Sequence, residues 1–223
     1  MQFHQVQLKT HNLSSLIHFY RDVLEMPVTE NAAGRVSIHT AHTNLVFDET
    51  ADSSGNPVYH FAMNIPSNTI EEAYQWLKDR TELLWLEDYN SYIADFVNWH
   101  AKSVYFLDPA GNIVEFIARF DLQDNVAEPF SSKQIRNISE VGIVFPVAFY
   151  RQSTEKLVKD NNLHYFSKQP PLENFCAIGD DEGLFIVVPE SRSWYPCADK
   201  PAGIYPLEVS FTDSNTSFNI RLK

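Results

Sequence analysis

The sequence predicts an α+β fold built from tandem units of the order βαββ or βαβββ. Two observations carry this prediction: segments of strand-like and helix-like hydrophobic periodicity alternate along the chain, and their order recurs. The first two units start at strands that contain His4 and His60, which gives a period of about 56 residues. Units of this kind pack their helices on one face of a curved sheet.

The first unit begins with an alternating strand, in which His4, Val6 and Leu8 share one face. A helix follows, with Asn12 as its N-cap and Pro27 just beyond its end. We expect the remaining elements of this unit to be strands over 36–40 and 45–47 and a loop over 51–57.

The second unit repeats this order. Its expected elements are a strand over 59–65, a helix over 70–77 and strands over 83–86, 103–107 and 113–118. A type I turn, Asp-Pro-Ala-Gly at 108–111, joins the last two strands. Residues 1–120 are therefore predicted to form one domain of two paired units.

The polar segment 121–137 has no periodicity and reads as a linker. A degenerate, truncated pair of units follows over 138–223, with a strand over 138–145, a helix over 148–161 and strands over 175–178, 184–188 and 205–212. Because unit three lacks a complete partner, we expect it to pack against the first domain or to form a two-fold homodimer. The homodimer is the favoured of the two.

Composition restricts the class of protein. An apolar fraction of 44% in 223 residues excludes wholesale disorder. A formal net charge of −12 disfavours nucleic acid and anionic membranes as partners. No apolar run approaches the roughly 20 residues of a membrane span, and no signal peptide is recognisable. Cys176 and Cys197 form no disulfide framework, so we expect a cytoplasmic protein.

Three residues are candidate metal ligands. His4 and His60 occupy equivalent places in two successive units, which favours a shared site over two unrelated core histidines. Glu115 lies between Ile113 and Ile117 on an apolar strand face, where an ionised carboxylate needs a partner or a cation. Two imidazoles and one carboxylate leave open coordination positions for substrate, water or dioxygen.

Three motifs resemble a known family, the vicinal oxygen chelate superfamily of glyoxalases, bleomycin-resistance proteins and extradiol dioxygenases. They are FYRDVLEMPV at 19–28, YHFA at 59–62 and VYFLDPAGNIVE at 104–115, and the resemblance covers residues 1–119 well and 138–212 loosely. It implies paired βαβββ modules that form a cupped half-barrel, with helices outside and a divalent metal in the cup. It also implies that His4, His60 and Glu115 match the family's metal positions.

The sequence differs from one branch of the family in the number of candidate metal ligands. Glyoxalase I-type members have a fourth ligand, a Glu on the last strand of the first module, where this chain has Leu45, Val46 and Phe47. A set of three protein ligands is similar to that of the extradiol dioxygenases or of the fosfomycin-resistance thiol transferases. The candidate catalytic residues are Tyr105, as a hydrogen-bond donor to a metal-bound substrate oxygen, and His100, as an acid or base.

The leading functional prediction is a metal-dependent, ring-cleaving dioxygenase of the extradiol type, acting on a catechol-like small molecule. Fe(II) is the favoured metal, with Mn(II), Zn(II) or Ni(II) as alternatives. A glyoxalase-like lyase or isomerase, or a thiol transferase acting on a small metabolite or antibiotic, would use the same site without dioxygen. A metal-free binding protein that stacks ligands on Trp85, Tyr92 and Trp99 is the third alternative.

Overall fold

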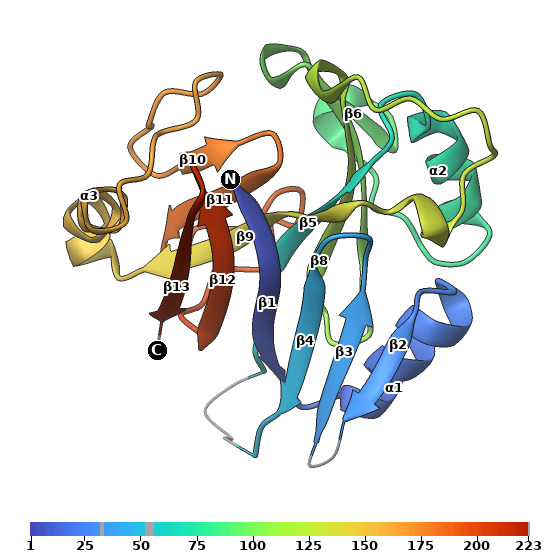
Figure 1. Cartoon of the computed structure of the whole chain (residues 1–223), viewed down its shortest axis with the longest axis horizontal. Coiled ribbons are helices and arrows are strands. Elements are labelled where there is room, and N and C mark those ends of the chain that lie inside the picture. Colours follow the sequence, from blue (N-terminus) through green and yellow to red (C-terminus); the bar gives the residue numbers. More distant parts are fainter. Residues whose placement is uncertain (32–33, 52–55, 223) are drawn as a thin grey trace.

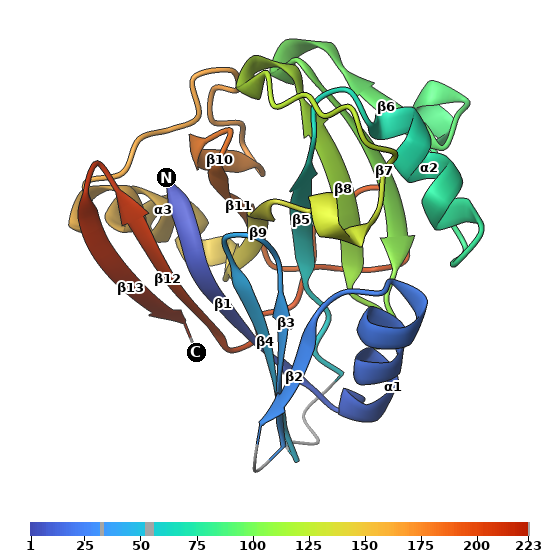
Figure 2. The same cartoon turned by 45° about the vertical axis from the view of Figure 1, so that its right-hand side comes forward.

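The computed structural model describes residues 1–31, 34–51 and 56–222. The strands among these residues form two curved sheets, one of six strands and one of seven (Figures 1 and 2). We call the sheet that contains β1 the first sheet and the sheet that contains β5 the second sheet. The predicted α+β class is confirmed, with few helices lying against strongly curved sheets.

The strand order of the first sheet is β13-β12-β1-β4-β3-β2, and that of the second is β10-β11-β9-β5-β8-β7-β6. The first sheet consists of β1 (Gln2–Thr10), β2 (Val28–Asn31), β3 (Arg35–His39), β4 (Asn44–Glu49), β12 (Leu207–Asp213) and β13 (Thr216–Leu222). The second sheet consists of β5 (His60–Ile65), β6 (Ile93–Phe96), β7 (Ala101–Leu107), β8 (Ile113–Arg119), β9 (Asn137–Phe145), β10 (Cys176–Asp180) and β11 (Gly183–Pro189).

The units pair differently from our expectation. Units one and two were expected to share a half-barrel, but β1 of unit one pairs with β12, and β5 of unit two pairs with β9. Alternating hydrophobicity specifies which face of a strand is buried, but not which strand lies beside it. Unit three is thus paired within the chain, which removes the reason for expecting a homodimer.

The helices lie against the sheets at three places. The short helix α1 (Leu13–His18) continues into a π-helical turn over Phe19–Val23 and packs on β3 and β4. The other two are α2 (Ile70–Lys78), which packs on β7 and β8, and α3 (Tyr150–Asp160), which packs on β9 and β11. Single 3₁₀ turns occur at Glu87–Tyr89, Val97–Trp99, Phe120–Leu122, Ser132–Gln134 and Val147–Phe149.

The elements that sequence reasoning missed lie at the sheet edges. The strands β2, β6 and β13 are edge strands, and β2 is exposed over most of its length, so it has no alternating apolar pattern. The strand expected over 83–86 is reduced to isolated bridges at Leu83 and Leu86. Part of the loop expected over 51–57 lies outside the described residues.

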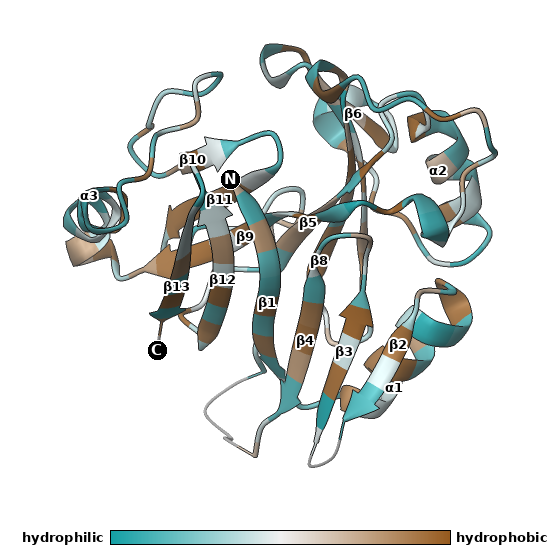
Figure 3. Cartoon of the chain, viewed as in Figure 1, coloured by the Kyte–Doolittle hydropathy of each residue, from teal (hydrophilic) through white to brown (hydrophobic). Residues whose placement is uncertain are grey.

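The second sheet is covered on both faces, which explains the hydrophobic character of β8 and β9 (Figure 3). One face of the second sheet packs with the first sheet and the helices in the main core, and Phe116 of β8 lies in that core. Its other face carries a second cluster that includes Tyr105, Ile186 and Trp194. Because strand side chains alternate, Glu115 faces this second cluster and not the main core.

Both cysteines, Cys176 and Cys197, are free and buried. Within residues 1–31, 34–51 and 56–222, no helix has both the length and the apolar character that crossing a lipid bilayer requires.

Candidate metal centre

Three buried side chains converge on the second sheet: His60, Glu115 and Glu140. Each offers one ligand atom, and these atoms all lie within 4.8 Å of one another. The Nε2 atom of His60 lies 3.7 Å from Oε2 of Glu115 and 3.7 Å from Oε2 of Glu140. The three residues are only 6%, 2% and 3% exposed, so the two carboxylates are held together in a buried position.

The strand register brings these residues together. His60 is the first residue of β5, and Ala62, two residues later on the same face, pairs with Glu115 of β8 and with Glu140 of β9. Ala62 is therefore the residue between the two carboxylates in the strand pairing, and its side chain is a single methyl group. The site therefore depends on three neighbouring strands from units two and three.

His4 does not join this cluster, which corrects the prediction of its placement. It lies on β1 in the first sheet, is exposed, and its Nε2 is 2.5 Å from the hydroxyl of Thr212. The cause is the pairing of the units: β9 and not β1 lies beside β5. Glu140 takes the third position, and it occupies in unit three the place that His4 has in unit one.

The imidazole of His60 is oriented by the backbone. Its Nδ1 donates a hydrogen bond to the carbonyl oxygen of Ile113 at 3.2 Å, so Nε2 faces the carboxylates. Burial alone would lower the pKa of His60, but Glu140 and Glu115 outweigh burial and raise it. Burial, with the nearby charge of Glu140, raises the pKa of Glu115 to about 7.

A fully buried arginine, Arg119, binds the carboxylate oxygen of Glu140 that does not face His60. Arg119 donates from Nη2 to Oε1 of Glu140, which leaves Oε2 facing His60. It also donates from Nη1 to Asp181 and from Nε to Asn64, at 3.2 Å each. The orientation of Glu140 is therefore fixed by the side chain of Arg119, which also offsets part of its charge.

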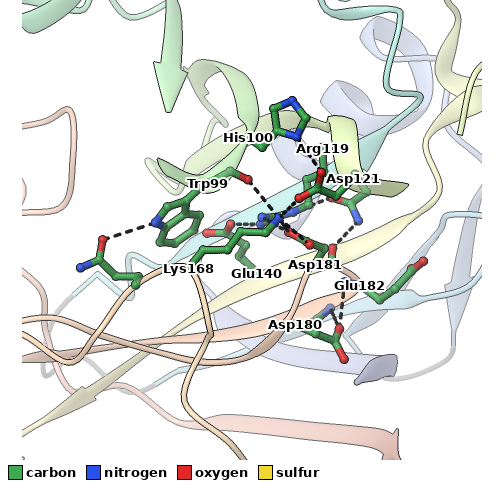
Figure 4. Close-up of polar contacts among 12 residues, drawn as sticks. Trp99, His100, Arg119, Asp121, Glu140, Lys168, Asp180, Asp181 and Glu182 are labelled. Atoms are coloured by element: carbon green, nitrogen blue, oxygen red, sulfur yellow. Dashed lines mark hydrogen bonds and ion pairs between the residues drawn. The ribbon is translucent and has the colours of Figure 1, made fainter. Parts of the chain in front are cut away.

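This contact begins a chain of ion pairs that leads to the surface (Figure 4). Asp181 accepts from Lys168 at 2.7 Å, and Lys168 lies 2.8 Å from Asp121. Asp121 in turn contacts Nδ1 of His100 at 2.6 Å. His100 is exposed at the outer end of this chain and does not line the cavity described next, which corrects its predicted place in the site.

A cavity of about 290 Å³ opens over the three ligand candidates. Its walls are largely aromatic, and its other lining residues are Phe96, Trp99, Tyr105, Gln169, Leu172, Phe175, Ile186, Arg192, Trp194 and Tyr195. Tyr105 is the cross-strand partner of Glu115, and burial and the charges of Glu115 and Glu140 raise the pKa of its hydroxyl. The hydroxyl therefore stays protonated and able to donate a hydrogen bond.

The position in unit three that corresponds to Glu115 in unit two holds an apolar residue, Ile186. Unit three repeats unit two around the cavity: Gly142 pairs with Ile186 as Ala62 pairs with Glu115. Ile186 thus stands where a second carboxylate would stand in a symmetrical site. Gly142 also makes room for Trp194, whose ring lies 5.4 Å from that of His60, because a Cβ at Gly142 would lie 2.5 Å from the indole.

The donor set fits a divalent ion. An ion that holds its ligands at about 2.0–2.2 Å separates any two of them by at most about 4.4 Å, and the two 3.7 Å distances in this site lie within that limit. One imidazole and two carboxylates can be provided by His60, Glu115 and Glu140. With His60 protonated and Arg119 in place, the charges of the cluster also balance without an ion, so an ion must compete with the His60 proton.

Of the residues that the sequence singled out, the structure brings His60, Glu115 and Tyr105 together at the cavity, whereas Glu140 was not among the predicted site residues. Its signal was present, because Glu140 lies between Ile138 and Gly142 on one strand face, as Glu115 lies between two isoleucines. Of the three residues proposed for ligand stacking, Trp99 lines the cavity, whereas Trp85 and Tyr92 are exposed and contact each other elsewhere, at 5.0 Å between ring centroids.

One solved structure shares the fold over nearly the whole chain, and others match about half of it. A candidate dioxygenase from Bacillus subtilis subsp. subtilis strain 168 superposes with a TM-score of 0.60 at 12% identity, covering 99% of this chain and 84% of its own. A glyoxalase/bleomycin resistance protein/dioxygenase from Nocardioides matches at 23% identity, with a TM-score of 0.42, over 59% of this chain and 90% of its own.

A third neighbour is lactoylglutathione lyase from Agrobacterium tumefaciens, at 20% identity and a TM-score of 0.41, over 51% of this chain and 90% of its own. Among proteins of curated function, none matches. The family description "Glyoxalase/Bleomycin resistance protein/Dioxygenase superfamily" matches residues 2–116, slightly more than half of the sequence. The chain therefore belongs to the glyoxalase/bleomycin resistance protein/dioxygenase superfamily, the vicinal oxygen chelate proteins.

Proposed function

We propose that the protein is a divalent-metal-dependent enzyme that acts on a small planar molecule with two neighbouring oxygen atoms. Within this class, we propose ring cleavage of the extradiol type on a catechol-like substrate. The observation that carries the proposal is the cluster of His60, Glu115 and Glu140 at the base of an aromatic cavity of about 290 Å³. That volume is at the lower end of ligand pockets and suits a single ring.

His60, Glu115 and Glu140 would hold the ion. Carboxylates suit Mn(II), whereas imidazole suits iron, zinc and nickel. Because the third candidate ligand is Glu140 and not a second histidine, Mn(II) is as good a candidate as Fe(II). When bound, the ion supplies a Lewis acid and a template for the two substrate oxygens. Ile186 offers no ligand at the fourth position, which leaves room for a substrate at the ion.

The other residues of the cavity orient the substrate. The protonated hydroxyl of Tyr105 is placed to donate a hydrogen bond to a substrate oxygen beside Glu115. The rings of Trp99, Phe175 and Trp194 offer faces for stacking and keep water from the substrate. This arrangement favours a flat, aromatic molecule over a flexible one.

The test is oxygen uptake after anaerobic loading with Fe(II) or Mn(II), across a panel of catechols, together with the absorbance of a ring-opened product. We expect uptake to require the metal and to fall by at least a hundredfold in Glu140→Gln. Uptake that stays at background in the metal-loaded protein for every catechol would contradict the ring-cleaving proposal.

A lyase, isomerase or thiol transferase is the second candidate. It is favoured by the ligand set itself, because one imidazole with two carboxylates differs from the set of two imidazoles and one carboxylate that is typical of Fe(II) oxygenases. Activity on an α-keto aldehyde–thiol adduct without oxygen, with no uptake on catechols, would select this candidate over the first.

A further inference from the structure

Arg192 is a cation on the cavity wall that has no acidic partner. It is half-buried, its Nη1 donates to the carbonyl oxygen of Ser193 at 3.2 Å, and its guanidinium lies 5.4 Å from the ring centroid of Phe175. Across the part of the chain that the structure describes, no carboxylate oxygen lies within 4.0 Å of it. Its charge is therefore not compensated within the protein.

The lack of a partner is unusual for this chain. Six of its eight arginines form ion pairs among the described residues, namely Arg21, Arg35, Arg80, Arg119, Arg136 and Arg221. The other unpaired one, Arg151, is exposed on α3, where water solvates it. With 29 acidic residues in the chain, a half-buried arginine without one is a feature that needs a ligand to explain it.

Acidic and basic side chains line different parts of the cavity. Glu115 and Glu140 lie on the strands that form its floor, and Arg192 lies on the segment that follows β11 and forms a wall. Trp194 and Tyr195, which follow Arg192 in the same segment, each have a buried polar atom, Nε1 and the hydroxyl, with no hydrogen-bond partner among the described residues. Both residues line the cavity, so a ligand with acceptor atoms could satisfy them.

We propose that the substrate carries an anionic group, a carboxylate, which pairs with Arg192 while its two neighbouring oxygens lie at His60, Glu115 and Glu140. The class of ligand is a single-ring aromatic acid with vicinal oxygens, and Arg192 is the residue that distinguishes it from a neutral ring. Guanidinium–carboxylate pairs are planar and bidentate, which would also fix the direction of the ring in the cavity. This inference rests on the proposed function for the oxygen-binding end of the ligand.

The test is calorimetric titration of the oxygen-free protein, once loaded with Mn(II) and once metal-free, with three ligands: catechol, 3,4-dihydroxybenzoate and benzoate. We expect 3,4-dihydroxybenzoate to bind at least tenfold more tightly than catechol. Arg192→Gln should abolish this difference and leave catechol binding unchanged, and Arg192→Lys should keep part of it. Arg151→Gln removes one positive charge from the surface and should keep the full difference in affinity between 3,4-dihydroxybenzoate and catechol.

The outcomes separate the two proposals. If catechol binds only with the metal but the carboxylate gives no advantage in the wild-type protein, the role of Arg192 is wrong and the proposed function stands. If catechol binding does not depend on the metal, while benzoate binding is lost in Arg192→Gln, the proposed function is wrong and the anion site stands. An equal loss in Arg151→Gln would also overturn the inference, because a general charge effect would then explain it.

Discussion

At the scale of single residues, the site could be predicted wherever a polar side chain interrupts an apolar strand face. Glu115 between two isoleucines was found in this way, and Glu140 carries the same signal. The partner of Glu140 could not be predicted, because Arg119 lies at the end of β8 and reaches Glu140 only through the pairing of β5 with its two neighbours. A contact of this kind is visible only once the register is known.

Removal of Arg119 should be costly. Arg119→Met would leave the buried Glu140 without its arginine, while Asp181 would keep Lys168, so we expect a loss of about 3–5 kcal/mol in the free energy of unfolding. Arg136→Met, which breaks a partly exposed pair with Asp124, should cost about 1 kcal/mol or less. Urea denaturation measures both, and equal losses would show that Arg119 does not offset a buried charge.

Metal affinity should fall as the pH falls. The pKa of Glu115 is raised to about 7, so below that pH its carboxyl holds a proton that an ion must displace; the pKa of His60 is raised as well, which strengthens the competition between its proton and an ion. We expect the Mn(II) affinity to decrease by up to about tenfold per pH unit, for each proton displaced, as the pH falls below 7. Titrations at pH 6, 7 and 8 measure this, and an affinity that is constant over this range would contradict it.

At the scale of elements, the buried strands, the helices and the edge strand β10 could be predicted from periodicity, and the edge strands β2, β6 and β13 could not. The strand expected over 113–118 is β8 and the helix expected over 70–77 is α2, each within one or two residues. Their side chains face a core on at least one side, so their sequences carry a pattern. In contrast, β6 and β13 are held by backbone hydrogen bonds to a single neighbour, which leaves little trace in the sequence.

The strand β9 offers a test of how the cavity wall is built. In Gly142→Ala, the new Cβ would lie 2.5 Å from the indole of Trp194, so Trp194 must move away from His60. We expect a loss of about 1–3 kcal/mol in stability and a changed near-ultraviolet circular dichroism signal. Ser139→Ala, at a neighbouring buried position of β9, adds no atoms and should leave the signal unchanged. An unchanged signal in Gly142→Ala would show that Trp194 does not depend on this glycine.

At the scale of the whole molecule, the repeat could be predicted but the pairing of its units could not. Unit two could pair with unit one or with unit three, and the local sequence patterns do not distinguish these two arrangements. The structure joins unit two with unit three, and unit one with the hairpin β12–β13. This choice moved the third candidate ligand from His4 to Glu140 and made the C-terminal half part of the cavity.

Because one chain provides all three candidate ligands and the cavity wall, metal binding should not depend on assembly. We expect one ion per chain, with the same affinity at protein concentrations from about 0.1 to 100 μM, whatever mass light scattering gives. An affinity that weakens in step with the dissociation of an oligomer would show that a second chain completes the site.

The most direct test of the central claim is the Mn(II) affinity of three proteins measured side by side: the wild-type chain, Glu140→Gln and His4→Ala. We predict one ion per chain for the wild-type protein and for His4→Ala with equal affinity, because His4 is exposed on the first sheet. Glu140→Gln should bind at least tenfold more weakly, because it loses a ligand of the cluster. Full affinity in Glu140→Gln together with loss of binding in His4→Ala would contradict the claim.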